Sequence, residues 1–230
     1  MRVAGDEHFT VDGTLIDACA RLKSFQPRTG PKDPTDGGSG NASVDFHGQQ
    51  RSNATHQSTT DEQAQLARKG RGKEARLCYG LHALMENRPG LCVQVEITTA
   101  HGTTESTAAT ELLARQIGTA ERPPQSVGAD KGYDTAEVAG FCREHGIKPH
   151  LAQIQGRKVA GLDGRTTGSL GYQTSQKLRE RVEEIFGWAK EMGGWRRTRK
   201  RGTARMGLCG MLIRCAHNLV RMGKLLGNTS

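Results

Sequence analysis

The sequence predicts an α/β protein, with a mixed sheet flanked by helices and a disordered insert after the first strand. Short runs of apolar and β-branched residues predict strands at 8–12, 76–84, 91–98, 126–130 and 147–151. Apolar residues at helical spacing predict helices at 104–117, 135–145 and 175–192. The first three strands can form a meander and the later ones arrive through helices, so a sheet of mixed direction is expected.

The N-terminal part starts with a strand, HFTVD, that runs into Gly13 and Thr14. The next stretch, LIDACARLKSF, has an amphipathic pattern that predicts a helix ending near residue 25. Between 27 and 56 large apolar side chains are rare, while Gly, Pro, Asp and Ser are frequent. Such a stretch buries too little surface to offset its ordering entropy, so we expect it to lie outside the core.

The middle of the chain predicts a hairpin and two strand–helix units. The two hairpin strands are joined by the turn-rich MENRPG, and the spacing places Val93, Val95 and Ile97 on one face. The fourth strand, SVGAD, ends in Asp130, and the helix 135–145 is closed by Gly146.

The last predicted helix has one apolar stripe and one mixed line. The stripe, at alternating steps of four and three, is Leu178, Val182, Ile185, Ala189 and Met192. We expect Thr174 or Ser175 to cap this helix and Gly193-Gly194 to end it, before a basic arm and a final amphipathic helix.

The mixed line beside the stripe contains Arg179, Glu183, Phe186 and Lys190. One interpretation is a solvated helix face with an ion pair between residues four apart, worth a few tenths of a kcal/mol. The alternative is that Glu183 is a functional carboxylate flanked by basic side chains.

Basic residues are concentrated near this helix. Residues 176–205 hold ten Lys or Arg and four Glu, which is +6 of the formal net charge of +9. A patch of this density indicates a polyanionic partner, most simply nucleic acid.

Three acids are placed where a sheet gathers its functional groups. Asp12 ends the first strand, Asp130 ends the fourth, and Glu183 lies on the helix beside the basic arm. Gathered carboxylates repel one another unless a cation neutralises them, and oxygen-only ligands suit Mg²⁺ or Mn²⁺, here two ions. Both aspartates also fit ordinary turn capping, in VDGT and ADKGYD.

Other polar residues are interpreted more simply. We expect Asp17 and Asp61 to be structural or surface residues, Asp134 to cap the following helix, His82 to pack and His101 to face solvent. The basic run from Arg68 to Lys73 fits either phosphate contact or a soluble loop.

The six cysteines show no metal-binding spacing and fit a reducing compartment. The N-terminus has no apolar signal region, and the most apolar segment, 208–226, is interrupted by basic residues. We therefore expect a cytoplasmic, nucleoid-associated protein without a membrane partner.

Four segments resemble the catalytic region of bacterial insertion-sequence transposases of the DDE class, in the branch containing the family numbered five. They are VDGTLIDACARLKSF, the stretch 58–91, GADKGYDT and RERVEEIFGWAKEMGGWRRTRKRG. The family signature is an Arg, three residues, a catalytic Glu, six residues and a Lys, and Arg179, Glu183 and Lys190 match it. Gln176 stands where the wider signature has a Tyr.

The resemblance implies an RNase H-like fold, metal-dependent nicking at the element end, and attack of the freed 3′-OH on target DNA by a homo-oligomer on DNA. It implies Asp12, Asp130 and Glu183 as catalytic and metal-binding residues. Residues expected to bind DNA are Arg179, Lys190, Lys131, Arg196, Arg197, Arg199, Lys200 and Arg201.

The expected organisation has four parts. Residues 1–25 and 76–192 form the catalytic core, 26–75 a flexible insert, and 193–230 the basic arm and C-terminal helix. Because family members usually have a DNA-binding region before the first strand, the resemblance also suggests an N-terminally shortened chain. A second hypothesis is therefore a non-catalytic DNA-binding remnant that regulates or inhibits a full-length relative.

Overall fold

The computed structural model describes residues 7–30, 45–46, 49–70, 72–101, 104–153 and 164–227. Its main sheet has six strands. These are β1 (His8–Asp17), β6 (Gln65–Ala67), β7 (Arg76–Glu86), β8 (Leu91–Thr99), β9 (Ser126–Ala129) and β10 (Lys148–Leu151).

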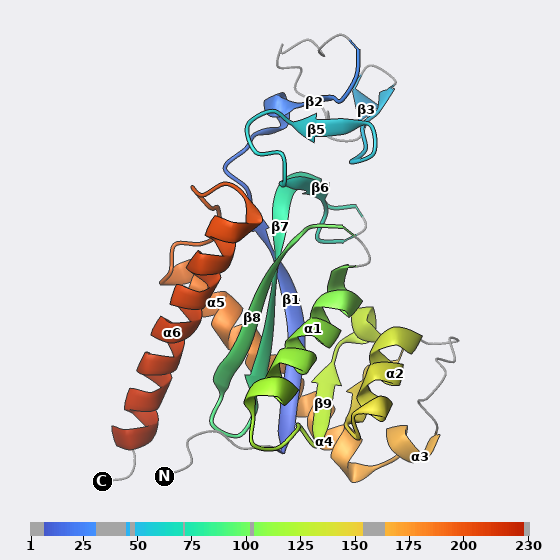
Figure 1. Cartoon of the computed structure of the whole chain (residues 1–230), viewed down its shortest axis with the longest axis vertical. Helices are drawn as coiled ribbons and strands as arrows, with labels where there is room; N and C mark the ends of the chain where they lie inside the picture. The colour runs from blue at the N-terminus through green and yellow to red at the C-terminus, as the bar shows by residue number, and fades with distance from the viewer. Residues whose placement is uncertain are drawn as a thin grey trace.

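The strand order confirms the predicted mixed sheet. β1 pairs antiparallel with β7, which pairs antiparallel with β8, so the first three long strands form the expected meander. On the other side β9 runs parallel to β1, and β10 runs parallel to β9. The resulting order, β8-β7-β1-β9-β10 with helices on both faces, is that of an RNase H-like fold (Figure 1).

Helices cover the two faces of the sheet, and each face has its own apolar cluster. On one face α1 (Thr104–Thr119) and α2 (Ala136–Glu144) enclose Phe9, Val11 and Leu84. On the other face α5 (Glu183–Glu191) packs over Ile16 and Leu81. α6 (Thr203–Gly227) runs along β8 at the side of the molecule (Figure 1). No helix among the described residues has the length and apolar character to cross a bilayer.

The helix predicted to end near residue 25 is wrong. β1 continues through Asp17, with Leu15 opposite Gly80 and Ile16 opposite Tyr79. The amphipathic pattern is overridden because β7 is long enough to pair with the first three residues of the stretch, Leu15 to Asp17, and because Ile16 fits the half-buried surface of a strand. Within the segment that was predicted as a helix, the helical part is a short 3₁₀ turn, η1 (Leu22–Ser24).

The hairpin is confirmed, but Val93 does not share a face with Val95 and Ile97. The register between β7 and β8 shifts at Leu84/Met85, where β8 has an extra residue. Val93 consequently packs against the cluster under α1, while Val95 and Ile97 belong to the cluster under α5.

The region predicted as a flexible insert contains short strands in its described part. β2 (Phe25–Pro27) pairs with β5 (His56–Ser58), β3 (Asp45–Phe46) pairs with β4 (Gln49–Gln50), and β6 joins the main sheet. Residues 31–44 and 47–48 lie outside the described residues, so the boundaries of the insert stay a prediction.

The helical segment that contains Glu183 begins earlier than expected. Ser169 is the N-cap of α4 (Leu170–Leu178) and accepts a hydrogen bond from the Tyr172 N–H at 3.1 Å; the predicted cap residue Ser175 is instead buried. α3 (Gly164–Thr167) precedes it, and a 3₁₀ turn, η3 (Arg179–Val182), separates α4 from α5. Glu183 is therefore the first residue of α5.

The predicted apolar stripe of this helix is confirmed in its central part. Val182, Ile185 and Ala189 are buried, and so is Phe186, whereas Met192 is 76% exposed. Met192 is the C-cap of α5, beyond the part of the helix that is packed on the sheet.

The basic arm after α5 is tied to the main sheet. Gly194 has a φ of +61°, a conformation that favours glycine where the chain leaves the helix. Asp17 at the end of β1 then forms a bridge with the arm: its N–H donates to the Arg196 carbonyl at 3.2 Å, and its carbonyl accepts from the Thr198 N–H at 2.8 Å. Farther on, the Gly202 N–H donates to the Tyr79 hydroxyl at 2.9 Å.

Candidate active site

A pocket lies along the part of β1 that β9 leaves uncovered. β9 pairs with β1 only from His8 to Val11, and the next four residues of β1 line the pocket. Its volume is about 870 Å³. The lining residues are Asp12, Gly13, Thr14, Leu15, Asn53, Leu66, Ala67, Arg68, Lys69, Gly80, His82, Ala100, His101, Glu105, Asp130, Tyr133, Glu183, Phe186, Gly187 and Lys190.

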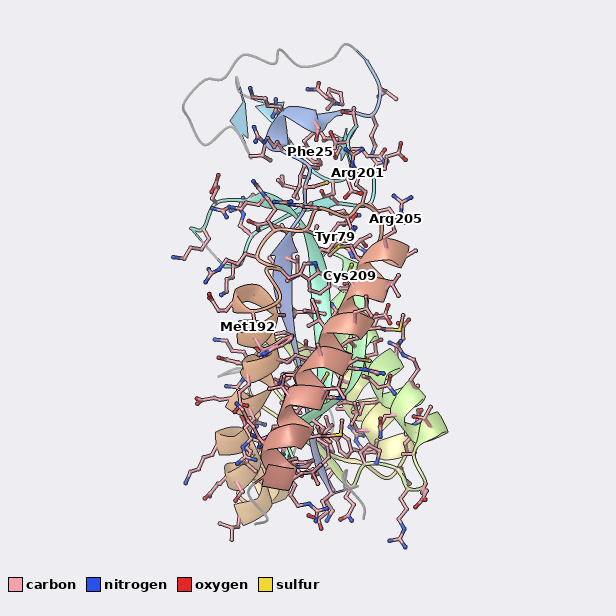
Figure 2. All side chains as sticks on the ribbon, turned by 90° about the vertical axis from the view of Figure 1, so that its left-hand side faces the viewer. Phe25, Tyr79, Met192, Arg201, Arg205 and Cys209 are labelled. Atoms are coloured by element: carbon pink, nitrogen blue, oxygen red, sulfur yellow. The ribbon has the colours of Figure 1, made fainter. Side chains whose placement is uncertain are left out.

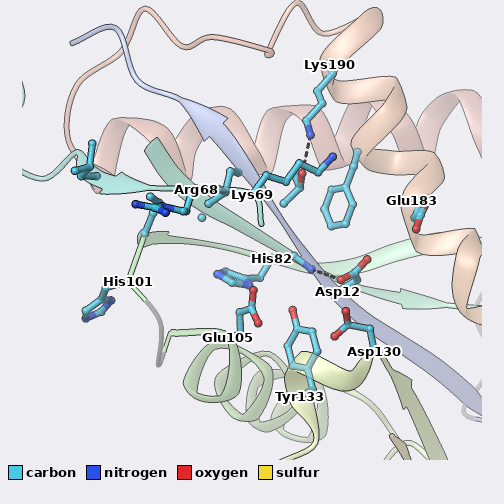
Figure 3. A pocket seen from close by; sticks show the side chains of 18 of the residues that line it. Asp12, Arg68, Lys69, His82, His101, Glu105, Asp130, Tyr133, Glu183 and Lys190 are labelled. Carbon is cyan, nitrogen blue, oxygen red and sulfur yellow. Dashed lines mark hydrogen bonds between the residues drawn. The ribbon is translucent and has the colours of Figure 1, made fainter. Parts of the chain in front are cut away.

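All three predicted acids line this pocket. Asp12 comes from β1, Asp130 directly follows β9, and Glu183 begins α5. Figure 3 shows the carboxyl groups of Asp12 and Asp130 near each other, with Glu183 pointing toward them from the helix. The three segments are distant in sequence, and the strand order brings them to one end of the sheet.

Each aspartate also interacts with its own turn. The Gly13 N–H donates to Asp12 Oδ1 at 2.7 Å, and the Gly132 N–H donates to Asp130 Oδ1 at 2.7 Å. Asp130 thereby caps the 3₁₀ turn η2 (Lys131–Tyr133). The turn-capping interpretation is therefore correct for one oxygen of each carboxylate, and it leaves the second oxygen for other contacts.

The site concentrates negative charge. Burial raises the pKa of the Asp12 carboxyl to about 6, and the charges of Asp130 and Glu183 act in the same direction. The Gly13 N–H and the Arg179 guanidinium act in the opposite direction. Asp12 is thus electrostatically linked to both other acids, and a bound cation would relieve their repulsion.

The donor set suits a hard divalent cation, since every acidic ligand offers oxygen. Among the described residues, however, no group of three or more Asp, Glu, His or Cys side chains is arranged to hold a metal ion. The predicted joining of all three carboxylates around metal ions stays a prediction.

Of the residues expected to bind DNA, Lys190 alone lines the pocket. Its Nζ donates to Thr14 Oγ1 at 2.6 Å, and burial, with the charges of Lys69 and Arg196, lowers its pKa. Arg179 is close enough to Asp12 to influence its charge.

The other expected DNA-binding residues lie on the surface outside the pocket. Lys131 is exposed on η2, and the arm residues Arg196, Arg197, Arg199, Lys200 and Arg201 are exposed beside the end of β1. Arg196 pairs with Glu191. Arg197 lines a second cleft together with Asp17 and Arg76.

The basic run after β6 contacts the pocket, and its contact with phosphate stays a prediction. Arg68 and Lys69 are exposed and line the pocket with Lys190, whereas the acids lie at its opposite end (Figure 3). The pocket therefore has a basic end and an acidic end.

Two pocket residues were missed in the sequence. Glu105 is a fourth acid, and burial together with the charge of Asp130 raises its pKa. Tyr133 is 1% exposed, and burial, followed by the charges of Asp12, Glu105 and Asp130, raises its pKa well above the usual range. The only signal for Tyr133 is its position three residues after Asp130, and Glu105 has none.

Gly13 is required by the close approach of two side chains. A Cβ at this position would lie 2.8 Å from His82 Nδ1 and 3.1 Å from the Tyr133 hydroxyl. Both of these polar atoms are buried and have no hydrogen-bond partner among the described residues. His82 is therefore packed, as expected, but under the pocket.

The remaining polar predictions have mixed outcomes. Asp61 is structural: it is buried and accepts the Tyr79 hydroxyl at 2.6 Å. Asp17 pairs with Arg76 at 3.0 Å. The predicted Asp134 cap is wrong, because Thr135 caps α2 and accepts the Val138 N–H at 3.3 Å; Asp134 is buried.

Comparison with known proteins identifies the family of the chain. No curated protein matches the chain. A family described as "Transposase DDE domain" matches residues 4–219. That range includes all six strands of the main sheet and every residue that lines the pocket. The chain therefore belongs to the transposase DDE domain family.

Proposed function

We propose that this chain catalyses metal-dependent DNA strand cleavage and strand transfer during transposition of an insertion sequence. The observation that supports this is the pocket, in which three acids from separate segments face basic side chains. A DNA backbone placed across it would have its phosphates near Lys190, Arg68 and Lys69 and one phosphodiester near the acids.

The proposed roles follow from the donor groups. Asp12, Asp130 and Glu183 hold Mg²⁺ or Mn²⁺, which would activate a water or a 3′-OH and stabilise the leaving oxygen. Asp12 and Asp130 are set by backbone N–H groups of their own turns. Glu183 is exposed at the start of α5 and approaches from the opposite wall of the pocket.

The basic residues have a different role. The Lys190 ammonium is held by Thr14, which lies two residues after Asp12 on the same strand. A phosphate bound by Lys190 would therefore have a fixed position relative to Asp12. The arm from Arg196 to Arg201 extends the basic surface beyond the pocket. These contacts supply affinity with little base selectivity.

Activity is tested with the purified chain and supercoiled plasmid. We expect nicked circles with Mg²⁺ or Mn²⁺ and none with EDTA. DNA binding in a gel shift without nicking under any metal condition would favour the alternative, a non-catalytic remnant that regulates a relative. The absence of both binding and nicking would contradict both functions.

Lys190→Ala is expected to weaken binding to DNA of every sequence alike. Loss of one phosphate contact should lower the slope of log affinity against log salt by roughly one. A gel-shift salt titration measures this slope. Lys177→Ala is the matched control, because Lys177 is exposed on α4 and does not line the pocket. An unchanged slope in Lys190→Ala would contradict the phosphate role.

A further inference from the structure

Two histidines lie on one face of the main sheet, on strands that are separated by β9. His8 is the first residue of β1 and lies opposite Ser126 of β9, and His150 of β10 lies opposite Gly128. Ser126 and Gly128 are two residues apart on β9, so they and the residues opposite them point to the same side of the sheet. The two imidazole rings consequently approach each other over β9, with their centroids 5.8 Å apart.

Gly128 makes this approach possible. A Cβ at this position would lie 2.7 Å from Ser175 Oγ of α4 and 3.5 Å from His8 Cε1. Because the glycine has no side chain, His8 and Ser175 both lie directly over β9, beside His150. We call His8, His150 and Ser175 the imidazole cluster.

Each member of the imidazole cluster has a buried polar atom without a hydrogen-bond partner among the described residues. These atoms are His8 Nε2, His150 Nδ1 and Ser175 Oγ. His150 is 7% exposed and Ser175 is 1% exposed. An unpaired polar group in a protein interior costs free energy, so three of them in one cluster indicate a ligand that bonds to them.

Hydrogen bonds of a neighbouring residue assign the lone pair of His8. The Ser126 hydroxyl donates to the Glu7 carbonyl at 3.2 Å, so its oxygen accepts from His8 Nδ1–H, at 2.9 Å. A neutral imidazole has one N–H group, so the free lone pair is on Nε2. Donation by the other ring nitrogen to an oxygen is the arrangement that orients metal-binding histidines.

Both imidazoles are held in position in the neutral form. The Gln176 side chain donates to the His150 carbonyl at 2.7 Å, and the Tyr172 ring meets the His150 ring edge-on with centroids 5.9 Å apart. Burial is the main cause that lowers the pKa of both histidines, that of His8 to about 4. Neutral imidazole is the form that binds metal ions.

We propose that the imidazole cluster binds Zn²⁺ through His8 Nε2 and His150 Nδ1. With Zn–N bonds of about 2.0 Å, two imidazoles on one ion have centroids roughly 5–6 Å apart, which matches the separation of these rings. The Ser175 hydroxyl and water would complete a coordination of four. Imidazole nitrogens favour Zn²⁺ over Mg²⁺, whereas the acids of the pocket offer only oxygen.

This site is separate from the candidate active site. His8 and Asp12 are four residues apart on β1, a distance of about 13 Å. The members of the imidazole cluster do not line the pocket. A Zn²⁺ ion here would connect β1 to β10 across β9, and both strands to α4. The proposal does not depend on the proposed function, and absence of Zn²⁺ binding would leave that function unaffected.

Zn²⁺ binding is measured by isothermal titration calorimetry of the metal-free protein, in excess Mg²⁺ so that oxygen-only sites are occupied. We expect one site with Kd on the order of 10 µM, because only two of its four ligands are protein nitrogens. His8→Gln and His150→Gln should each lose this site. At about ten times the Kd, Zn²⁺ should raise the Tm of the parent by roughly 4 °C and leave the Tm of both variants unchanged.

Two controls exclude other ligands. His145→Gln should keep the site, because His145 is exposed at the end of α2. Cys209→Ser/Cys215→Ser tests the accessible thiols of α6 and should also keep the site. Figure 2 shows Cys209 on the same part of the molecule as Tyr79, which pairs with Ile16 at the other end of β1 from His8.

The proposal is contradicted by three results. They are no Zn²⁺ binding by the parent, binding that either of the two histidine variants retains, or binding that the thiol variant loses. If a histidine variant does not fold, imidazole ¹⁵N spectra of the parent decide: Zn²⁺ must shift one histidine through Nε2 and another through Nδ1. Zn²⁺ binding that shifts no histidine resonance would show that the ion is held by other groups.

Discussion

Glu183→Gln is expected to lower metal-dependent nicking of supercoiled DNA roughly a thousandfold, because a ligand of the activating cation is worth several kcal/mol in the transition state. DNA affinity should stay equal or rise slightly, since the change removes a negative charge near phosphate. Nicking is measured in single-turnover time courses with Mg²⁺ and with Mn²⁺, beside a gel-shift titration of the same preparations.

The adjacent residue provides the control. Glu184 is also exposed on α5 but does not line the pocket, so Glu184→Gln should nick at the parent's rate. The two variants distinguish an effect of the position of Glu183 in the pocket from an effect of removing one negative charge from the helix. Nicking by Glu183→Gln at the parent's rate would remove Glu183 from the catalytic set while leaving the family membership intact.

Acidification is expected to destabilise the fold through His82. This side chain is 3% exposed, and burial lowers its pKa to about 4. The unfolded chain has a histidine pKa near 6.5, so below that pH the unfolded state binds the extra proton first. The loss of stability begins as the pH falls below about 6.5, saturates near pH 4, and amounts to about 3 kcal/mol for this residue.

Urea unfolding of the parent and of His82→Gln between pH 7 and pH 4 measures this effect. The free energy of unfolding should fall more steeply in the parent, and the difference between the two proteins should shift by about 3 kcal/mol across the range. His101→Gln is the control, because His101 is exposed. Parallel pH curves for parent and His82→Gln would show that His82 does not titrate as a buried group.

The sequence predicted the sheet well where its signal is local. The strand-forming runs of β7 and β8 and the strand–helix alternation after them were sufficient for the hairpin and for a sheet of mixed direction, and the order of the strands came from the structure. β1 was misread beyond Asp12, because a short amphipathic stretch fits a helix as well as a strand. The strand conformation is decided by the pairing of Leu15 and Ile16 with β7, which is a long-range contact.

The residues of the candidate site also divide into those with a local signal in the sequence and those placed by long-range packing. Asp130 was predictable because it directly follows a strand, and Glu183 because of the spacing around it. Asp12 was expected to end its strand, but it lies inside β1, which continues to Asp17. Glu105 and Tyr133 were not predictable, since their place in the pocket depends on how α1 and η2 pack beside β1. The pKa of Asp12 likewise arises from neighbours that only the folded chain brings together.

The bridge between Asp17 and the arm relates the place where the arm would bind DNA phosphates to the place where the DNA strand would be cut. Asp12 and Asp17 lie on one strand, five residues apart, a span of about 17 Å. Successive phosphates of a DNA strand advance about 3.4 Å along the helix axis, so this span equals about five base pairs. If the duplex axis runs along β1, the phosphates that the arm is proposed to hold should lie about five base pairs from the bond that is cut, whatever the sequence between them.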